Sequence, residues 1–217
     1  MMPAKIEKPG SEPVLIKHPH LLIVEGLEDA RFFSALIEHM RLEKVQIQII
    51  VAGGKTEIRN RVRAIANAPG FKEMVVSLGI LRDANSDPNA AFQSIRDALK
   101  AVGLPSPNCQ LEVVGSKPRV GVLILPGSSP GSLEDLCLAS VTEDPAMACV
   151  EQYFECLKKL GSLLPDNISK AKIHVFLASR PKAGLRLGEA AEKGYWPWNH
   201  EAFEPIKNFI KNLVLGV

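Results

Sequence analysis

The sequence predicts an α/β protein with a mostly parallel sheet flanked by helices and a helical C-terminal portion. Apolar segments rich in Val, Ile and Leu lie at 21–24, 45–51, 74–82 and 120–125, and a helical stretch follows each of them. Continuous apolar runs of this kind suit strands that are covered on both faces. Because the strands alternate with helices, the sheet is expected to be parallel and doubly wound.

The composition indicates a globular protein, because 46% of the 217 residues are hydrophobic and 23% are charged. The net charge of +2 gives no overall electrostatic signature of nucleic-acid binding. No apolar run is long enough for a membrane span, and the first residues lack a signal-peptide core, which predicts a cytoplasmic protein. We expect a flexible tail (1–18), an α/β core (19–140) and a helical portion packed on the core (141–217).

The cysteines, Cys109, Cys137, Cys149 and Cys156, have neither the spacing of a zinc site nor the density of a disulfide scaffold. We therefore expect free, buried thiols in a reducing compartment.

The first strand ends in a carboxylate and a glycine, Glu25 and Gly26, and Asp29 follows about one helical turn later. A buried strand does not favour a carboxylate in its middle, so Glu25 belongs at the carboxyl end, where open α/β sheets present their ligands. Gly26 allows the backbone to turn sharply. A plainer interpretation is that Glu25 ends the strand and Asp29 stabilises the start of the helix at 28–40 through the macrodipole.

A glycine-rich turn, AGGKTE at 52–57, joins the second strand to the next helix. Its GGKT resembles the end of a nucleotide-binding P-loop, but that motif needs glycine where Ile49 stands, so a P-loop is excluded. Gly53 and Gly54 remain candidates for holding an anion through their backbone amides. A plain turn explains the two glycines equally well.

Acids recur where the later strands end. Asp83 follows the third strand with Asn85 two residues further on, and Glu134 and Asp135 open the helix after the fourth strand. Helix capping by Ser132 and the macrodipole would explain the last two acids without any chemistry. Because parallel strands end at the same edge of a sheet, we expect these side chains to converge with Glu25.

Carboxylates crowded at one edge repel one another, and a divalent cation is the usual remedy. Oxygen ligands suit Mg²⁺ or Mn²⁺. Two such ions can activate a water and stabilise the leaving oxygen of a phosphodiester. The candidate ligands are Glu25, Asp29, Asp83, Asn85, Glu134 and Asp135.

Helical spacing dominates after residue 140. It predicts helices at 145–160 and 203–215 and favours a helix over a strand at 168–179. An aromatic cluster, Trp196 and Trp198 around Pro197, is expected to pack the last helix down, with a binding role as the alternative.

Several of these motifs resemble the Toprim domain, the metal-binding domain shared by topoisomerases and bacterial primases. They are VEG at 24–26, the acid Asp29, the Asp-x-Asp-like DAN at 83–85 and LED at 133–135. The Glu-x-x-x-Asp spacing is similar to that of Toprim nucleases of the overcoming-lysogenization-defect type. The likeness to Toprim, a Rossmann-like fold, covers residues 20–140, and a likeness to a family of small bacterial Toprim-like proteins continues through RLGEAAEKG to the C-terminus.

The resemblance implies that Glu25 and Asp29 hold one metal ion, that Asp83 bridges or holds a metal, and that Glu134 with Asp135 completes a second site. It implies catalytic roles for Glu25 and Asp83.

The resemblance also implies that Lys182, in SRPKAG, is a catalytic lysine near the scissile phosphate, with a solvated loop lysine as the alternative. The second aspartate of the Toprim motif is Asn85 here. A neutral amide oxygen lowers metal affinity, so the sequence supports the fold more strongly than the catalytic site.

The leading hypothesis is therefore Mg²⁺- or Mn²⁺-dependent phosphodiester hydrolysis on DNA or RNA, with phage defence as one context. The alternative is a non-catalytic Toprim-like module with a weakened metal site that binds nucleic acid or a protein partner, which includes a second copy of the chain. A third interpretation is chemistry on a small phosphorylated ligand. A membrane partner is not expected.

Overall fold

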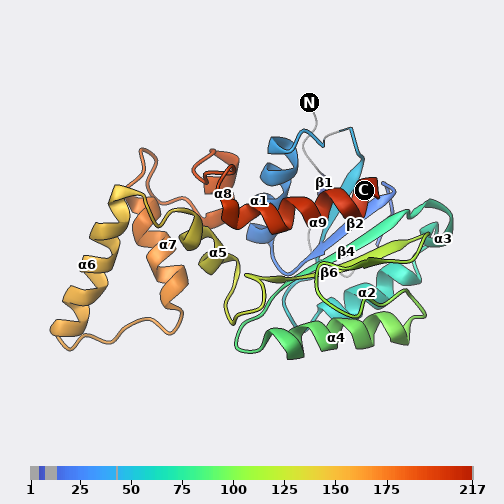
Figure 1. The fold of residues 1–217 in the computed structure, drawn as a ribbon, viewed down its shortest axis with the longest axis horizontal. Helices are drawn as coiled ribbons and strands as arrows, with labels where there is room; N and C mark the ends of the chain where they lie inside the picture. The colour runs from blue at the N-terminus through green and yellow to red at the C-terminus, as the bar shows by residue number, and fades with distance from the viewer. Residues whose placement is uncertain (1–4, 8–13, 43, 217) are drawn as a thin grey trace.

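The computed structural model describes residues 5–7, 14–42 and 44–216. They form a six-stranded sheet with the order β1-β3-β2-β4-β6-β5, covered by helices on both faces (Figure 1). All neighbouring strands are parallel except the short β5, which pairs antiparallel with β6, so the predicted α/β class with a mostly parallel sheet is confirmed. The strands are β1 (Lys5–Glu7), β2 (His20–Val24), β3 (Ile47–Val51), β4 (Ser77–Asp83), β5 (Val113–Val114) and β6 (Arg119–Leu125).

Helices α2, α3 and α4 cover one face of the sheet, and α1 and α9 cover the other, with α8 packed against α1 (Figure 1). The remaining helices, α5, α6, α7 and the short 3-10 helix η1, follow β6, and α6 and α7 project beyond the sheet (Figure 1). The helices are α1 (Leu27–His39), α2 (Ile58–Ala66), α3 (Phe71–Met74), α4 (Pro88–Ala101), α5 (Leu133–Ser140), α6 (Pro145–Lys159), α7 (Ile168–Ala178), α8 (Leu187–Glu192), η1 (Glu201–Phe203) and α9 (Glu204–Leu215).

Alternate residues of the central strands face opposite sides of the sheet, which explains why these strands are apolar throughout. In β2, Leu22 and Val24 join the core beside α1 and α9, whereas Leu21 and Ile23 join the core beside α2 and α4. All of them are fully buried. Since burial of one such side chain contributes about 1.5–3 kcal/mol, β2 stabilises both layers of the fold.

The chain leaves β2 and β4, which are neighbours, in opposite directions across the sheet. Helix α1 connects β2 to β3 on one side, and α4 connects β4 toward β6 on the other. In open α/β sheets, ligands bind outside the carboxyl ends of the strands at the point where the direction of the connections reverses. That switch point lies here at the ends of β2 and β4.

Two strand glycines allow α9 to lie close to the sheet. A Cβ on Gly79 of β4 would come within 2.5 Å of Leu213 Cδ2, and one on Gly121 of β6 would come within 2.7 Å of Phe209 Cε2. Larger residues at these positions would push α9 away. The final helix predicted at 203–215 is confirmed, with η1 as its first turn.

The helical interpretation of 168–179 is also confirmed, because this segment forms α7. Its buried residues, Ile173, Phe176 and Leu177, recur at helical spacing. The predicted helix at 145–160 is α6. Within the described part of the chain, no helix combines the length and the apolar character needed to cross a membrane.

The aromatic cluster packs against the start of the last helix, as predicted, because the ring centroids of Trp198 and Phe203 lie 5.3 Å apart. Trp196 is buried, donates from Nε1 to the Leu187 carbonyl at 3.1 Å and stacks on Phe176 of α7. Trp198 packs edge-on against Phe32 of α1.

The third strand begins three residues later than the apolar pattern predicts, at Ser77 instead of Met74. Gly70, with a φ of 83°, precedes a single helical turn that buries Phe71, and Met74 ends this turn. The local glycine therefore overrides the strand pattern at its first residues.

The N-terminal segment predicted as a tail is described only in part, and 1–4 and 8–13 lie outside the described residues. Residues Lys5–Glu7 pair with β3 as an edge strand, and Val14 and Ile16 are buried.

The expectation of buried thiols is correct only for Cys137. Cys109, Cys149 and Cys156 are exposed, because they lie on a loop and on the outer face of α6. All of them are free, as predicted.

Gly121→Val should lower the free energy of unfolding by about 1–3 kcal/mol, because the new side chain collides with the Phe209 ring. Urea unfolding measures the change. Phe209→Leu in the same background removes the colliding ring edge and should recover part of the loss, with Phe209→Leu alone as the control. Unchanged stability of Gly121→Val would contradict the close seating of α9 on β6.

Candidate acidic pocket at the sheet switch point

Two acidic residues stand where the central strands end. Glu25 directly follows β2, and Asp83 is the last residue of β4. The Glu25 Oε1 atom accepts a hydrogen bond from the Asp83 backbone N–H at 3.1 Å. Parallel pairing of β2 with β4 thus brings together residues that are 58 positions apart in the sequence.

Two further acids come from the first turns of α1 and α5. Asp29 Oδ2 accepts the Gly26 N–H at 2.7 Å, which caps α1. Asp83 Oδ1 accepts the Leu133 N–H at 3.0 Å, which attaches the start of α5 to β4 and places Glu134 beside it. Unpaired N–H groups and the macrodipole favour carboxylates at helix starts.

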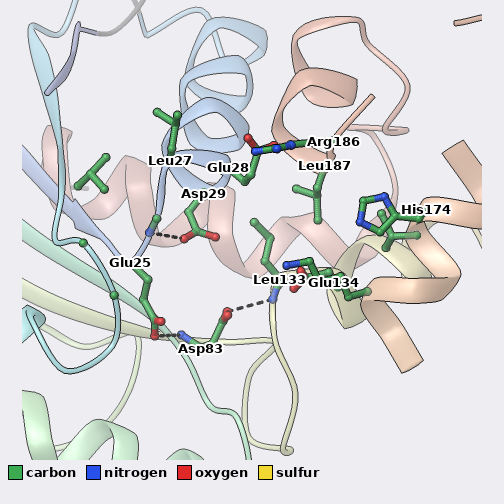
Figure 2. Close-up of a pocket in the computed structure, with 16 residues that line it drawn as sticks. Glu25, Leu27, Glu28, Asp29, Asp83, Leu133, Glu134, His174, Arg186 and Leu187 are labelled. Carbon is green, nitrogen blue, oxygen red and sulfur yellow. Dashed lines mark hydrogen bonds between the residues drawn. The ribbon is translucent and has the colours of Figure 1, made fainter. Parts of the chain in front are cut away.

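These acids line one pocket of about 920 Å³. In Figure 2, Glu25 and Asp83 lie on one side of the pocket, and His174 and Arg186 lie on the other. The lining residues are Glu25, Gly26, Leu27, Glu28, Asp29, Val51, Gly53, Gly54, Asp83, Leu133, Glu134, Lys170, Ile173, His174, Arg186 and Leu187. The pocket therefore lies between the edge of the sheet and the C-terminal helices.

Burial disfavours the charged form of the pocket acids. It raises the pKa of Asp29 to about 7 and the pKa of Asp83 to about 8, and it also raises the pKa of Glu25. The negative charges of Asp29, Glu25 and Glu134 add to the rise at Asp83. Near neutral pH the pocket therefore keeps protons that exposed carboxyl groups would have lost.

Among the acids of this pocket, Glu25 has positive charge nearby in the described part of the chain. The Arg82 Nε atom lies 3.8 Å from Glu25 Oε1, and the charges of Arg82 and Lys55 lower the pKa of Glu25 without cancelling the effect of burial. Among the described residues, no ion pair within 4.0 Å involves Asp29, Asp83 or Glu134.

The chemical type of these donors suits a hard divalent cation. Glu25, Asp29 and Asp83 each use one carboxylate oxygen for a backbone N–H and keep the other without a hydrogen bond to the described residues. In the described part of the chain, however, no group of three His, Cys, Asp or Glu side chains is arranged to hold a metal ion. A cation would require these side chains to rotate toward it.

The predicted site residues Asn85 and Lys182 lie outside this pocket. Asn85 is exposed, adopts a left-handed conformation (φ 53°) and donates from Nδ2 to the Asp83 carbonyl. Its backbone pairs with Gly131 in an isolated bridge, and the residue does not line the pocket. The Lys182 side chain is exposed, and its backbone N–H donates to the Tyr195 hydroxyl.

Asp135 also lies outside the pocket and has a different partner. The sequence Leu-Glu-Asp opens both α1 and α5, and one acid of each copy attaches a C-terminal helix. Glu28 Oε2 accepts the Gly188 N–H of α8 at 2.9 Å, and Asp135 Oδ1 accepts the Ser169 hydroxyl of α7. The other oxygen of Asp135 caps α5 by accepting the Ser132 N–H at 2.8 Å.

Gly53 and Gly54 line the pocket, but their amides already have a partner. Both N–H groups donate to the Glu25 carbonyl oxygen at 3.0 Å. The glycine turn therefore holds the backbone of Glu25 instead of presenting free amides for an anion.

The interpretation of the sequence missed the opposite side of the pocket, which carries the cations Lys170 and Arg186 together with the ring of His174. The spacing of Lys170 and His174 on a helix was a signal that the two side chains share a face. Arg186 gave no such signal, because its position depends on how α8 packs against α1.

The fold and the pocket define a protein with an open, mostly parallel α/β sheet and an acidic site at the switch point of that sheet. The chain belongs to the family described as protein of unknown function (DUF3226), whose family model matches residues 19–215. Comparisons with curated proteins and with solved structures find no match.

The free energy of unfolding of the metal-free protein should decrease as the pH rises from about 4 to about 8. The pKa values of Asp29 and Asp83 are raised in the folded state, so over this range the folded protein binds more protons than the unfolded chain, and each rise in pH favours unfolding. Asp83→Asn removes one titrating group and keeps an oxygen for the Leu133 N–H. It should therefore lose less stability, by about 1–3 kcal/mol at the upper end of the range.

Urea unfolding in the presence of a chelator measures this pH dependence. Glu38→Gln, which removes an exposed carboxylate of α1 outside the pocket, is the control and should follow the wild type. An Asp83→Asn curve parallel to the wild-type curve would show that Asp83 does not titrate in this range.

Proposed function

We propose that the protein is a divalent-metal-dependent phosphodiesterase that acts on nucleic acid and that its sheet is Toprim-like. The observation that supports this proposal is the convergence of Glu25, Asp29, Asp83 and Glu134 in one pocket at the switch point. Acids that retain protons because of burial and mutual repulsion are suited to exchange those protons for a divalent cation.

Glu25, Asp83 and Glu134 would hold Mg²⁺ or Mn²⁺, with Asp29 as the fourth carboxylate nearby. When bound, the ion would supply positive charge to the oxygens of a phosphodiester. Asp29, whose pKa is raised to about 7, can give or take a proton near neutral pH. Asn85, Asp135 and Lys182 take no part in this proposal.

A second candidate function is a non-catalytic module that binds nucleic acid or a protein partner through the same surface. It is favoured by the observation that the described residues form no group arranged to hold a metal ion. It is also favoured by the backbone contacts of Asp29 and Asp83, which cap α1 and attach α5 without needing any cation.

Calorimetric titration with Mn²⁺ should give saturable heat, and binding should release protons because Asp29 and Asp83 lose them. The measured heat should therefore change with the ionisation enthalpy of the buffer, and affinity should rise with pH. Glu25→Gln and Asp83→Asn should each weaken binding by at least about tenfold and abolish Mn²⁺-dependent cleavage of a labelled oligonucleotide.

Glu38→Gln is the matched control and should bind and cleave like the wild type. No heat with Mn²⁺, together with salt-sensitive binding of nucleic acid, would favour the non-catalytic module. Cleavage of a nucleotide but not of a polymer would instead favour chemistry on a small phosphorylated ligand.

A further inference from the structure

The C-terminal helices give the acidic pocket a wall of opposite charge. Lys170 and His174 come from α7, and Arg186 directly precedes α8. Figure 2 shows that His174 and Arg186 lie across the pocket from Glu25 and Asp83. Ile173 and Leu187 form the apolar part of the same wall. One pocket therefore presents carboxylates on the sheet side and cationic or N–H-donating groups on the helix side.

The fold fixes the position of α7 at this wall. The Ser169 hydroxyl donates to Asp135 in the first turn of α5, and Asn167 caps α7 by accepting the Lys170 N–H at 2.8 Å. Lys170 and His174 are four residues apart, so they lie on the same helix face, one turn from each other. The attachment through Asp135 sets this face beside Glu134.

A close contact fixes α8 in a similar way. Gly188 lies against α1 so closely that a Cβ would come within 2.6 Å of the Glu28 carbonyl oxygen. Its N–H donates to Glu28 Oε2, and the Arg186 N–H donates to Glu189 at 2.9 Å. The indole of Trp196 holds the other side through the Leu187 carbonyl. Arg186 is therefore placed at the pocket by packing that leaves α8 little freedom to shift.

Some cations of the C-terminal helices have an acidic partner, which distinguishes them from the side chains of Lys170 and His174. Arg180 pairs with Asp144 at 2.9 Å, and Lys172 pairs with Glu151 at 2.6 Å. The side chains of Lys170 and His174, in contrast, make no hydrogen bond or ion pair with the described residues, although carboxylates line the same pocket. The two charged sides of the pocket thus face each other without pairing.

A ligand between these sides needs anionic groups for the helix wall. Phosphates meet this requirement, and Lys and Arg are their usual partners. The volume of about 920 Å³ is that of a small-molecule site, so it has room for a short piece of one strand but not for a double helix. Because the wall offers contacts to phosphates, it does not discriminate between bases.

We propose that Lys170, His174 and Arg186 form a phosphate-binding wall that holds one single strand of nucleic acid against the acidic edge, without sequence preference. This assignment rests on the proposed function for its reaction, because it names the substrate form on which the phosphodiesterase acts. Lys170 and Arg186 supply charge, and His174 supplies a ring N–H.

Fluorescence anisotropy with a labelled single-stranded oligothymidine in the presence of a chelator tests the wall without metal or cleavage. The double variant Lys170→Ala/Arg186→Ala should bind about 10- to 100-fold more weakly. The slope of log affinity against log salt concentration should also become shallower by about 1.4, which is about 0.7 for each lost phosphate contact on a single strand. His174→Ala should weaken binding with little change in slope.

The control is Lys159→Ala/Lys193→Ala, which removes the same net charge from exposed positions of the C-terminal helices outside the pocket. It should bind like the wild type, and all variants should unfold at similar temperatures because these side chains are exposed. An equal loss in both double variants would overturn the wall, as would tighter binding of a duplex or of a free nucleotide than of the single strand.

The two proposals fail in different ways. If the wild-type protein binds the strand through the wall but gives no heat with Mn²⁺, the proposal of a phosphate-binding wall stands and the proposal of a metal-dependent phosphodiesterase is wrong. If the wild-type protein binds Mn²⁺ but not the strand, the proposal of a metal site stands and the proposal of a phosphate-binding wall is wrong.

Discussion

The repulsion among carboxylates in one partly buried pocket is the constraint on which this structure depends. Such crowding is tolerated because some of the acids keep their protons near neutral pH and because backbone N–H groups from several elements solvate the carboxyl oxygens. Gly26, the N-cap of α1, donates to Asp29, the start of α5 donates to Asp83, and β4 itself donates to Glu25. Each of these donors is a group that its strand or helix would otherwise leave without a partner at that end. The acids and the ends of the elements therefore stabilise one another.

Glu25 is the residue at which these interactions meet. Its carbonyl oxygen accepts the N–H groups of Gly53 and Gly54, and its side chain accepts the Asp83 N–H. One residue thus connects the ends of β2, β3 and β4. The glycine turn after β3 reaches the Glu25 carbonyl oxygen at the end of the neighbouring strand β2. It therefore contributes to the pocket by holding the backbone of Glu25 in place.

The sequence was sufficient to predict the central strands and the long C-terminal helices, although the first residues predicted for the third strand form a helical turn. Apolar runs identified the central strands, and parallel pairing then placed Glu25 near Asp83. The sequence could not predict which of two neighbouring acids at a helix start lines the pocket, because the two side chains point to different partners. Glu134 lines the pocket, whereas the adjacent Asp135 turns to Ser169, which is 34 positions away. Nothing in the spacing of LED distinguishes these two outcomes, because both acids suit the positive end of a helix.

The C-terminal helices form the opposite wall of the pocket and also contribute to the burial of the acids. Ile173 and Leu187 cover the side of the pocket that the sheet leaves open, and burial is the largest cause of the raised pKa at Asp29 and Asp83. An α/β core without α7 and α8 would keep the same carboxylates but expose them to water, so their pKa values would return toward those of ordinary acids. Helix α7 is attached through Asp135, which is next to Glu134, and α8 is attached through Glu28, which is next to Asp29. The position of the wall therefore depends on residues that are direct neighbours of the pocket acids. The two sides of the pocket consequently form one unit, in which the packing of the helices determines how strongly the sheet edge holds protons.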